Sequence, residues 1–397
     1  MIDISEALSF IDRETRGIGT EKIGLPSAVG RVLAEDIIAD SDLPPFDRSQ
    51  MDGFAVISSD TENSPVTLKI VGESAAGRGW HKNIKSGEAV RIMTGAPVPT
   101  GADAVQKVEL TSESHGTVQI LEPVKPGQSM IGKGSEVGKG SAVFTAGDII
   151  TENMIAPLAA FGYAKARVGK VPRVSILGTG SEIVEITRKP GRDQIRNSNS
   201  VMLNVFARRF SARTEIRSIV KDDIAGLRSE IKNAARVADI LVITGGVSVG
   251  KYDLTKAALA DLGAEIFFEK LRLKPGKPAV FARLGKCLIF GLPGNPVSAA
   301  VTFHLVVRRA ILRLQGAASP DIQTGHAITA ANVKAAKERD TYLPSKLDTT
   351  PDGQLIAHPL KWQGSSDFIG FARADSMIFL PRGQHSAAGD IVEIAFL

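Results

Sequence analysis

The segment Thr244–Asp253, TGGVSVGKYD, predicts both a fold and a binding site. Four apolar residues, Ile240–Ile243, lead into it, and a helical pattern follows it. A glycine-rich turn between a strand and a helix lets backbone N–H groups approach a ligand, and the helix dipole favours an anion there. The carboxylate of Asp253 would repel that anion unless a divalent cation such as Mg²⁺ lies between them. The segment therefore predicts an α/β unit that binds an anion, although turn glycines and helix caps without a ligand are the alternative.

Strands and helices alternate on both sides of this segment. Helices are expected over residues 198–210, 224–238 and 252–263, and a long closing helix over 297–316. Between them lie apolar runs with the length and composition of strands. Alternation at this spacing predicts a mostly parallel sheet with helices on both faces.

The rest of the chain predicts a multi-domain α/β plus β protein. Residues 3–16 have one apolar helical face, and Asp3 with Glu6 fits a capping box at its start. Pro44 and Pro45 forbid a helix across that point and indicate a boundary. Short alternating runs before and after the α/β unit are typical of β domains. The expected domains are a mixed N-terminal domain (1–45 with 136–169), an inserted β domain (46–135), the α/β domain (170–317) and a small C-terminal β domain (318–397).

Composition excludes several classes of protein. The chain has 397 residues, too many for one core, with 43% apolar and 23% charged residues and a net charge of +5. Aromatic residues make up only 5% and the basic residues are dispersed, which argues against nucleic-acid binding. No apolar run is long enough to span a membrane, and the N-terminus lacks the pattern of a signal peptide. The single cysteine, Cys287, fits a reducing compartment, so a cytoplasmic protein is expected.

Several expected strands end in acidic or glycine-rich segments. GTGSE ends at Glu182, the next strand ends at Asp222, Asp253 follows the third, and GLPGNP (291–296) ends a later one. Ligands bind open parallel sheets at the carboxyl ends of the strands, so these segments are expected to meet along one edge. Gly245, Gly246, Ser248 and Gly250 would contribute turn atoms to the same site.

Two further segments suit a polyanionic ligand. In EKLRLKPGKP, the basic residues Lys270, Lys274 and Lys277 lie close together, with the first two on one face of a strand. They predict a clamp for phosphate or an oxyanion such as molybdate, unless the strand is a solvated edge. In QIRNSNS, capping a helix explains one of Asn197, Ser198 and Asn199, and the others could bind a heterocycle or a phosphate. Asp47 and Asp52 flank a turn that, taken alone, is of the Asx type.

These segments together resemble the molybdopterin molybdenumtransferase family, to which the E domain of gephyrin belongs. PPFDRSQMDGFAV and RIMTGAPVPTGADAV are similar to its N-terminal motifs, and GTGSE, QIRNSNS, TGGVSVGKYD, LKPGKP and GLPGNPVS follow in the family's order. The resemblance implies a homodimer of four-domain subunits with the active cleft between them. It also implies that adenylylated molybdopterin and molybdate are the substrates and that AMP is released with Mg²⁺.

The resemblance assigns roles to individual residues. The acidic positions of the site fall on Asp52, Glu182, Asp222 and Asp253, of which Asp222 and Asp253 would hold Mg²⁺. Glu136 stands where the family has an acid in a Gly-Glu-Asp run. Pro344 stands where a second arginine is common. The remaining substrate-binding positions fall on Thr94, Lys270, Lys274, Pro293, Pro296, Arg339 and Ser365.

Two other functions remain compatible with the sequence. A molybdopterin adenylyltransferase acts one step earlier and shares the GGVSVG motif, but it needs only the α/β domain. A non-catalytic scaffold of the same fold would lack turnover while keeping the dimer. Adenylate formation from ATP and free molybdopterin would identify the first, and a molybdate titration would test the second.

Overall fold

The computed structural model describes residues 1–246, 254–361 and 364–397. The chain forms two compact units. The larger unit comprises Met1–Glu35, Ala146–Ile155 and Ala164–Leu397, and the smaller unit comprises Asp36–Thr145 and Ala156–Tyr163. No helix among the described residues is both long enough and apolar enough to cross a membrane. The finer division into four domains stays a prediction.

A six-stranded sheet forms the centre of the larger unit, in the order β16-β13-β17-β21-β20-β18. The first four strands are parallel neighbours, whereas β20 is antiparallel to both β21 and β18. This confirms the predicted, mostly parallel sheet. The strands are β13 (Arg173–Gly178), β16 (Arg213–Ile216), β17 (Ile240–Thr244), β18 (Glu265–Lys270), β20 (Pro278–Leu284) and β21 (Cys287–Leu292).

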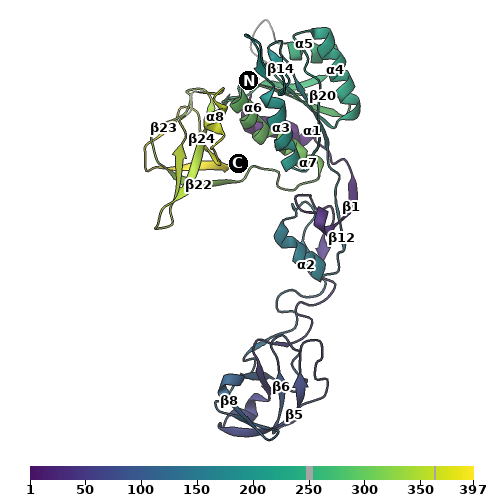
Figure 1. The fold of residues 1–397 in the computed structure, drawn as a ribbon, viewed down its shortest axis with the longest axis vertical. Helices are drawn as coiled ribbons and strands as arrows, with labels where there is room; N and C mark the ends of the chain where they lie inside the picture. The colour runs from purple at the N-terminus through teal and green to yellow at the C-terminus, as the bar shows by residue number, and fades with distance from the viewer. Residues whose placement is uncertain (247–253, 362–363) are drawn as a thin grey trace. The chain divides into compact units, whose positions relative to one another are not determined.

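Helices cover both faces of this sheet, as the sequence predicted (Figure 1). Side chains of a strand alternate between its faces. Along β17, Ile240 and Val242 pack with one buried cluster, and Leu241 and Ile243 pack with the other. The first cluster includes α3 (Ser198–Arg209) and α6 (Pro296–Thr302), and the second includes α4 (Ile224–Val237) and α5 (Leu254–Asp261).

The closing helix differs from the regular helix expected over 297–316. After α6 the backbone forms a π-helical segment, Phe303–Val307, before α7 (Arg308–Leu314) continues. All five residues of the π-helical segment are buried. Such π segments widen a helix locally and are frequent at functional sites.

The first helix, α1 (Ile4–Glu14), lies within the predicted range 3–16. The capping box predicted at its start is wrong, because the Asp3 side chain makes no capping hydrogen bond. Its carboxylate instead accepts hydrogen bonds from Arg272 at 3.2 Å and from Arg382 at 2.9 Å. Charge-assisted bonds of this kind are stronger than bonds to a backbone amide, so they determine where Asp3 points.

The C-terminal sheet has the order β19-β24-β25-β22-β28-β26. Because β24 also pairs with β26, five of these strands form a closed ring. β19 (Leu273–Lys274), which belongs to the lysine-rich segment, pairs in parallel with β24. The ring consists of β22 (Thr324–Thr329), β24 (Asp340–Thr349), β25 (Leu355–Pro359), β26 (Ser376–Leu380) and β28 (Ile391–Phe396).

The smaller unit contains a second six-stranded sheet, in the order β7-β4-β6-β5-β9-β8. Gly53 begins β4 and pairs with Ile92 on one side and Lys107 on the other. A Cβ at Gly53 would lie 1.9 Å from the carbonyl oxygen of Gln106, so only glycine fits there. The strands are β4 (Gly53–Val56), β5 (Val66–Ser74), β6 (Glu88–Ile92), β7 (Ala104–Lys107), β8 (Thr111–Ser114) and β9 (Thr117–Ile120).

Candidate active site

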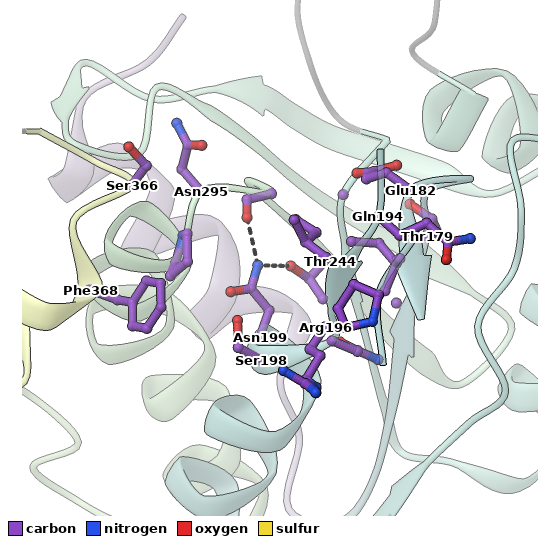
Figure 2. A pocket seen from close by; sticks show the side chains of 18 residues that line it. Thr179, Glu182, Gln194, Arg196, Ser198, Asn199, Thr244, Asn295, Ser366 and Phe368 are labelled. Atoms are coloured by element: carbon purple, nitrogen blue, oxygen red, sulfur yellow. Dashed lines mark hydrogen bonds between the residues drawn. The ribbon is translucent and has the colours of Figure 1, made fainter. Parts of the chain in front are cut away.

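A cavity of about 700 Å³ lies where the strands of the central sheet end, and we call it the strand-end pocket (Figure 2). It gathers the loops that follow β13, β17 and β21 and the beginning of α3. Several predicted site residues line it, which confirms that these segments meet. Among its lining residues are Thr179, Glu182, Asn197, Ser198, Asn199, Thr244, Gly245, Asn295 and Pro296.

A short parallel ladder joins two of the predicted motifs at this pocket. β14 (Ile183–Val184) pairs with β15 (Ile195–Arg196). The N–H of Asn197 donates to the carbonyl of Val184 at 2.9 Å, and the N–H of Ile195 donates to the carbonyl of Glu182 at the same distance. This ladder places the amide-rich QIRNSNS segment directly beside GTGSE.

The glycines of the TGG turn allow two loops to approach each other closely. Gly245 has φ +95°, and a Cβ there would lie 2.4 Å from the carbonyl oxygen of Thr179. At Gly246, with φ +62°, a Cβ would lie 3.0 Å from the Thr179 hydroxyl. Both glycines are therefore required by packing against Thr179, whereas only Gly245 lines the strand-end pocket.

Two buried polar atoms at the strand-end pocket lack a hydrogen-bond partner among the described residues. They are the hydroxyl oxygen of Thr179 and Oδ1 of Asn199. Nδ2 of Asn199 is satisfied, because it donates to Oγ1 of Thr244 at 2.9 Å and to the carbonyl of Gly294 at 2.7 Å (Figure 2). Buried polar groups nearly always have a partner, so these two atoms are hydrogen-bonding groups that the described residues leave unused.

In the QIRNSNS segment, one residue caps a helix, as predicted. Oδ1 of Asn197 accepts a hydrogen bond from the N–H of Ser200 at 3.2 Å and so caps α3. Ser198 and Asn199 lie in the first turn of this helix and line the cavity. Their side chains are thus available to the cavity rather than to the cap.

A second cavity, of about 550 Å³, adjoins the first and is lined by Lys274 and Lys277, two of the three lysines of the predicted clamp. Lys274, Lys277 and Arg339 line it, and no acidic residue is found among its described lining residues. Three cations without an acid in the same wall favour an anionic guest. We call it the cationic pocket; Pro293 and Ser365 also line it.

Asn295 lines both pockets and connects the α/β domain to the C-terminal segment. Its Nδ2 donates to Oγ of Ser365 at 2.8 Å. The carbonyl of Ser365 also accepts from the N–H of Val297 at 3.1 Å, at the beginning of α6. Asn295 was not among the predicted site residues, because an Asn directly before a helix usually caps it. Its side chain makes no capping bond here.

Asp222 and Lys270 are described by the structure but do not line either pocket, and Asp253 is not described. Asp222 lies beside the GTGSE loop, accepting from the N–H of Ser181 at 3.1 Å, while its own N–H donates to Oγ of Ser181 at 3.2 Å. Three predicted site residues, Ser248, Gly250 and Asp253, lie outside the described residues.

Three predicted site residues belong to the smaller unit. Oδ1 of Asp52 accepts hydrogen bonds from the N–H and the hydroxyl of Thr94, each at 2.7 Å. These bonds, the backbone one first, hold the pKa of Asp52 below its ordinary value. Glu136 forms an ion pair with Arg48 at 3.0 Å.

The Asx-type turn predicted around Asp47 and Asp52 is wrong. Asp47 accepts from the N–H of Lys133 at 2.7 Å, and Asp52 accepts from Thr94. Both partners are distant in the sequence, so these carboxylates connect separate loops rather than close a local turn. Only the fold could reveal those partners.

Comparisons with known proteins match the chain along nearly its whole length. Residues 2–162 match the MoeA N-terminal region (domain I and II), residues 175–313 a probable molybdopterin binding domain, and residues 326–397 the MoeA C-terminal region (domain IV). A molybdopterin molybdenumtransferase of Staphylococcus epidermidis is 32% identical over 99% of this chain and 95% of its own length. A Staphylococcus aureus protein of the same name has the same identity and coverage.

Solved structures are similar over the full length as well. A molybdopterin biosynthesis MoeA protein from Pyrococcus horikoshii OT3 has a TM-score of 0.85, with 29% identity and full coverage of both chains. A second structure of a MoeA protein from Pyrococcus horikoshii has a TM-score of 0.80, with 31% identity, and covers 100% of this chain and 99% of that one. The fold is thus that of a multidomain enzyme of the transferase class. The chain belongs to the molybdopterin molybdenumtransferase family.

Proposed function

We propose that this protein inserts molybdate into adenylylated molybdopterin and releases AMP, forming the molybdenum cofactor. The supporting observation is the junction at Asn295 of two unlike pockets, one cationic and one lined by strand-end polar groups. A reaction between an oxyanion and a nucleotide-linked pterin needs both environments side by side. Family membership supports the same reaction.

Within this proposal, the cationic pocket binds the oxyanion. Lys274, Lys277 and Arg339 offset the charge of molybdate, and the rigid Pro275–Gly276 turn fixes the position of the two lysines. The strand-end pocket binds the pterin and phosphate portion through Thr179 and Ser198. The phosphoric anhydride bond then breaks, and the attacking oxygen comes either from molybdate or from water.

The proposed reaction includes a magnesium ion at the strand ends. Mg²⁺ keeps several waters and binds one or two carboxylates together with substrate phosphates. Asp222 is exposed, and Ser181 fixes its position at the strand end. Asp222 and Asp253 would hold the ion, which would supply charge neutralisation at the phosphoryl oxygens. Glu182 would act beside them as a catalytic acid.

We propose a homodimer in which each active site combines two subunits. Asp52, Thr94 and Glu136 would come from one subunit, and the lysines from the other. Asp52 would orient molybdate or accept a proton, and its lowered pKa keeps it ionised for either role. Mixing inactive Asp52→Asn and Lys274→Met variants tests this arrangement. Heterodimers would recover about half of the wild-type activity, whereas sites built within one subunit would recover none.

The direct test of the proposed function is AMP release from adenylylated molybdopterin. Wild-type protein should release AMP only with both Mg²⁺ and molybdate, and the product should activate a molybdenum enzyme that lacks its cofactor. Lys274→Met and Lys277→Met should each weaken molybdate binding at least tenfold. Lys286→Met removes the same charge at an exposed position outside the cationic pocket and should behave like wild type.

The same assay separates the alternatives. Adenylate formation from ATP and free molybdopterin, without molybdate-dependent AMP release, would identify an adenylyltransferase. Molybdate binding without any turnover would identify a scaffold. A cytoplasmic location is also proposed, since the only cysteine, Cys287, is a free buried thiol.

A further inference from the structure

A third cavity, of about 530 Å³, lies beside the strand-end pocket and has aromatic walls. One face of α3 supplies Met202, Phe206 and Arg209, whose spacing of three and four residues aligns them along the helix. His304 comes from the π-helical segment, and α8 (Phe368–Phe371) supplies Phe368 and Phe371. Its volume lies within the range of about 300–1,000 Å³ found for small-molecule sites. We call it the aromatic pocket.

The aromatic pocket is continuous with the strand-end pocket. Ser198, Asn199, Pro296 and Phe368 line both cavities. Figure 2 shows Asn199 and Phe368 at the strand-end pocket, on α3 and α8 respectively. One guest molecule can therefore occupy both cavities at once.

Two buried polar side chains in the aromatic pocket have unused hydrogen-bonding capacity. His304 is 4% exposed, and no described hydrogen bond reaches its ring nitrogens. Burial, followed by the charges of Arg308 and Arg209, lowers the pKa of His304 to about 3, so its ring is neutral. Asn199 has the unpartnered Oδ1 described above. A neutral imidazole and an amide oxygen together offer both acceptors and a donor.

The two pockets differ in the charge of their lining residues, so they favour different ligands. The cationic pocket has three basic residues and no described acid, whereas the aromatic pocket has Arg209 and Asp375 in balance. The oxyanion molybdate therefore favours the cationic pocket. A planar neutral heterocycle favours the aromatic pocket, where Phe368 and Phe371 can stack on it.

We propose that the aromatic pocket binds the adenine ring of the adenylate, an inference that rests on the proposed function. The amino group of adenine would donate to Oδ1 of Asn199, and a ring nitrogen would accept from the imidazole of His304. The pterin would remain in the strand-end pocket. Recognition of the nucleotide base would then be separate from recognition of the oxyanion.

Calorimetric binding of AMP and of ribose 5-phosphate to the full chain tests this proposal, because the two probes differ only by the base. Wild-type protein should bind AMP at least tenfold more tightly. Met202→Trp fills the aromatic pocket from α3 and should remove that preference, with ribose 5-phosphate and molybdate binding unchanged. Val205→Trp is the matched control, since Val205 is 58% exposed on the same helix and outside the pocket.

Equal affinity of wild-type protein for both probes, or full AMP affinity in a folded Met202→Trp variant, overturns the proposal. If Met202→Trp does not fold, photo-crosslinking of wild-type protein with 8-azido-AMP decides. Labels on α3 or α8 support the proposal, and labels confined to residues 273–277 contradict it. Molybdate-dependent AMP release by wild-type protein is measured separately. If wild-type protein releases AMP but the adenine test fails, only the assignment of adenine to the aromatic pocket is rejected. If wild-type protein releases no AMP, the proposed function itself is rejected.

Discussion

Asp52 and Thr94, 42 positions apart in the sequence, are joined by two hydrogen bonds of 2.7 Å to the same carboxylate oxygen. The backbone bond and the hydroxyl bond both stabilise the charged carboxylate, and they lower the pKa of Asp52. The second carboxylate oxygen stays available to a ligand in this arrangement. Under the proposed function, Thr94 would thus act on the reaction through Asp52.

Replacing Thr94 by Val removes the hydroxyl bond and keeps the backbone bond. The pKa of Asp52 should rise in Thr94→Val but remain below its ordinary value, because the backbone bond has the larger effect. Titration of the Asp52 carboxyl by ¹³C NMR measures this change. Thr111→Val, which alters a hydroxyl bonded only to the carbonyl of Val108, serves as the control. An unchanged pKa in Thr94→Val would show that the hydroxyl bond has no effect.

Gly53→Ala should destabilise the smaller unit by about 3 kcal/mol or more. The added Cβ would overlap the carbonyl of Gln106 in the neighbouring strand, and a backbone atom in a sheet cannot move aside cheaply. Urea unfolding followed by circular dichroism measures the loss. Gly132→Ala, whose nearest neighbour would be 3.9 Å away, should change stability by less than about 0.5 kcal/mol. Equal effects of the two substitutions would refute the packing argument.

His304 should make the folded state sensitive to acid. Because the pKa of His304 is about 3 when folded and about 6.5 when unfolded, only the unfolded chain takes up this proton between these pH values. Stability is therefore lost as pH falls through this window, at up to about 1.4 kcal/mol per pH unit. His304→Phe should lose less stability than wild type over the same range. Parallel stability curves for the two proteins, which share all other titrating groups, would contradict the assignment.

Asp12 should matter more to stability than an ordinary surface acid. Its carboxylate accepts hydrogen bonds from Arg309 at 2.6 and 2.7 Å and from Arg313 at 3.0 Å, which joins α1 to α7. Asp12→Ala leaves the largely buried Arg309 with only Asp321 and should cost about 1–3 kcal/mol. Asp261→Ala removes an exposed pair with Arg228 and should cost less than about 1 kcal/mol. Thermal unfolding of both variants makes the comparison, and a larger loss in Asp261→Ala would reverse this ranking.

The sequence predicted the central sheet well, because its pattern is local. The apolar run Ile240–Ile243, with alternate side chains now seen in two separate clusters, needed no tertiary information to be recognised as a buried strand. The order of acids and glycines along the chain then indicated which strand ends would meet. Thr179, Glu182 and Gly245 do meet at one pocket.

The predictions from sequence that were wrong or missing concern side chains whose hydrogen-bond partners are distant in the sequence. Asp3 has the local pattern of a helix cap, yet it binds Arg272 and Arg382 instead. Asn295 likewise precedes a helix and bonds to Ser365, 70 positions away. In each case the local sequence pattern favours a hydrogen bond to the backbone of the following helix. The folded chain instead gives the side chain a hydrogen-bond partner that is distant in the sequence. The aromatic pocket was not predicted for the same reason, since its walls come from four separate regions of the chain.

β19 pairs with the C-terminal ring through Leu273 and Lys274, although it follows directly from the central α/β sheet. The backbone of Lys274 is therefore paired with β24 of the ring and is also joined, through the preceding residues, to β18 of the central sheet. Any small rotation of the ring against the central sheet would displace its ammonium group and change the electrostatic potential experienced by a bound oxyanion. Under the proposed function, the pairing of Leu273 and Lys274 with β24 would therefore couple the position of the C-terminal ring to oxyanion affinity.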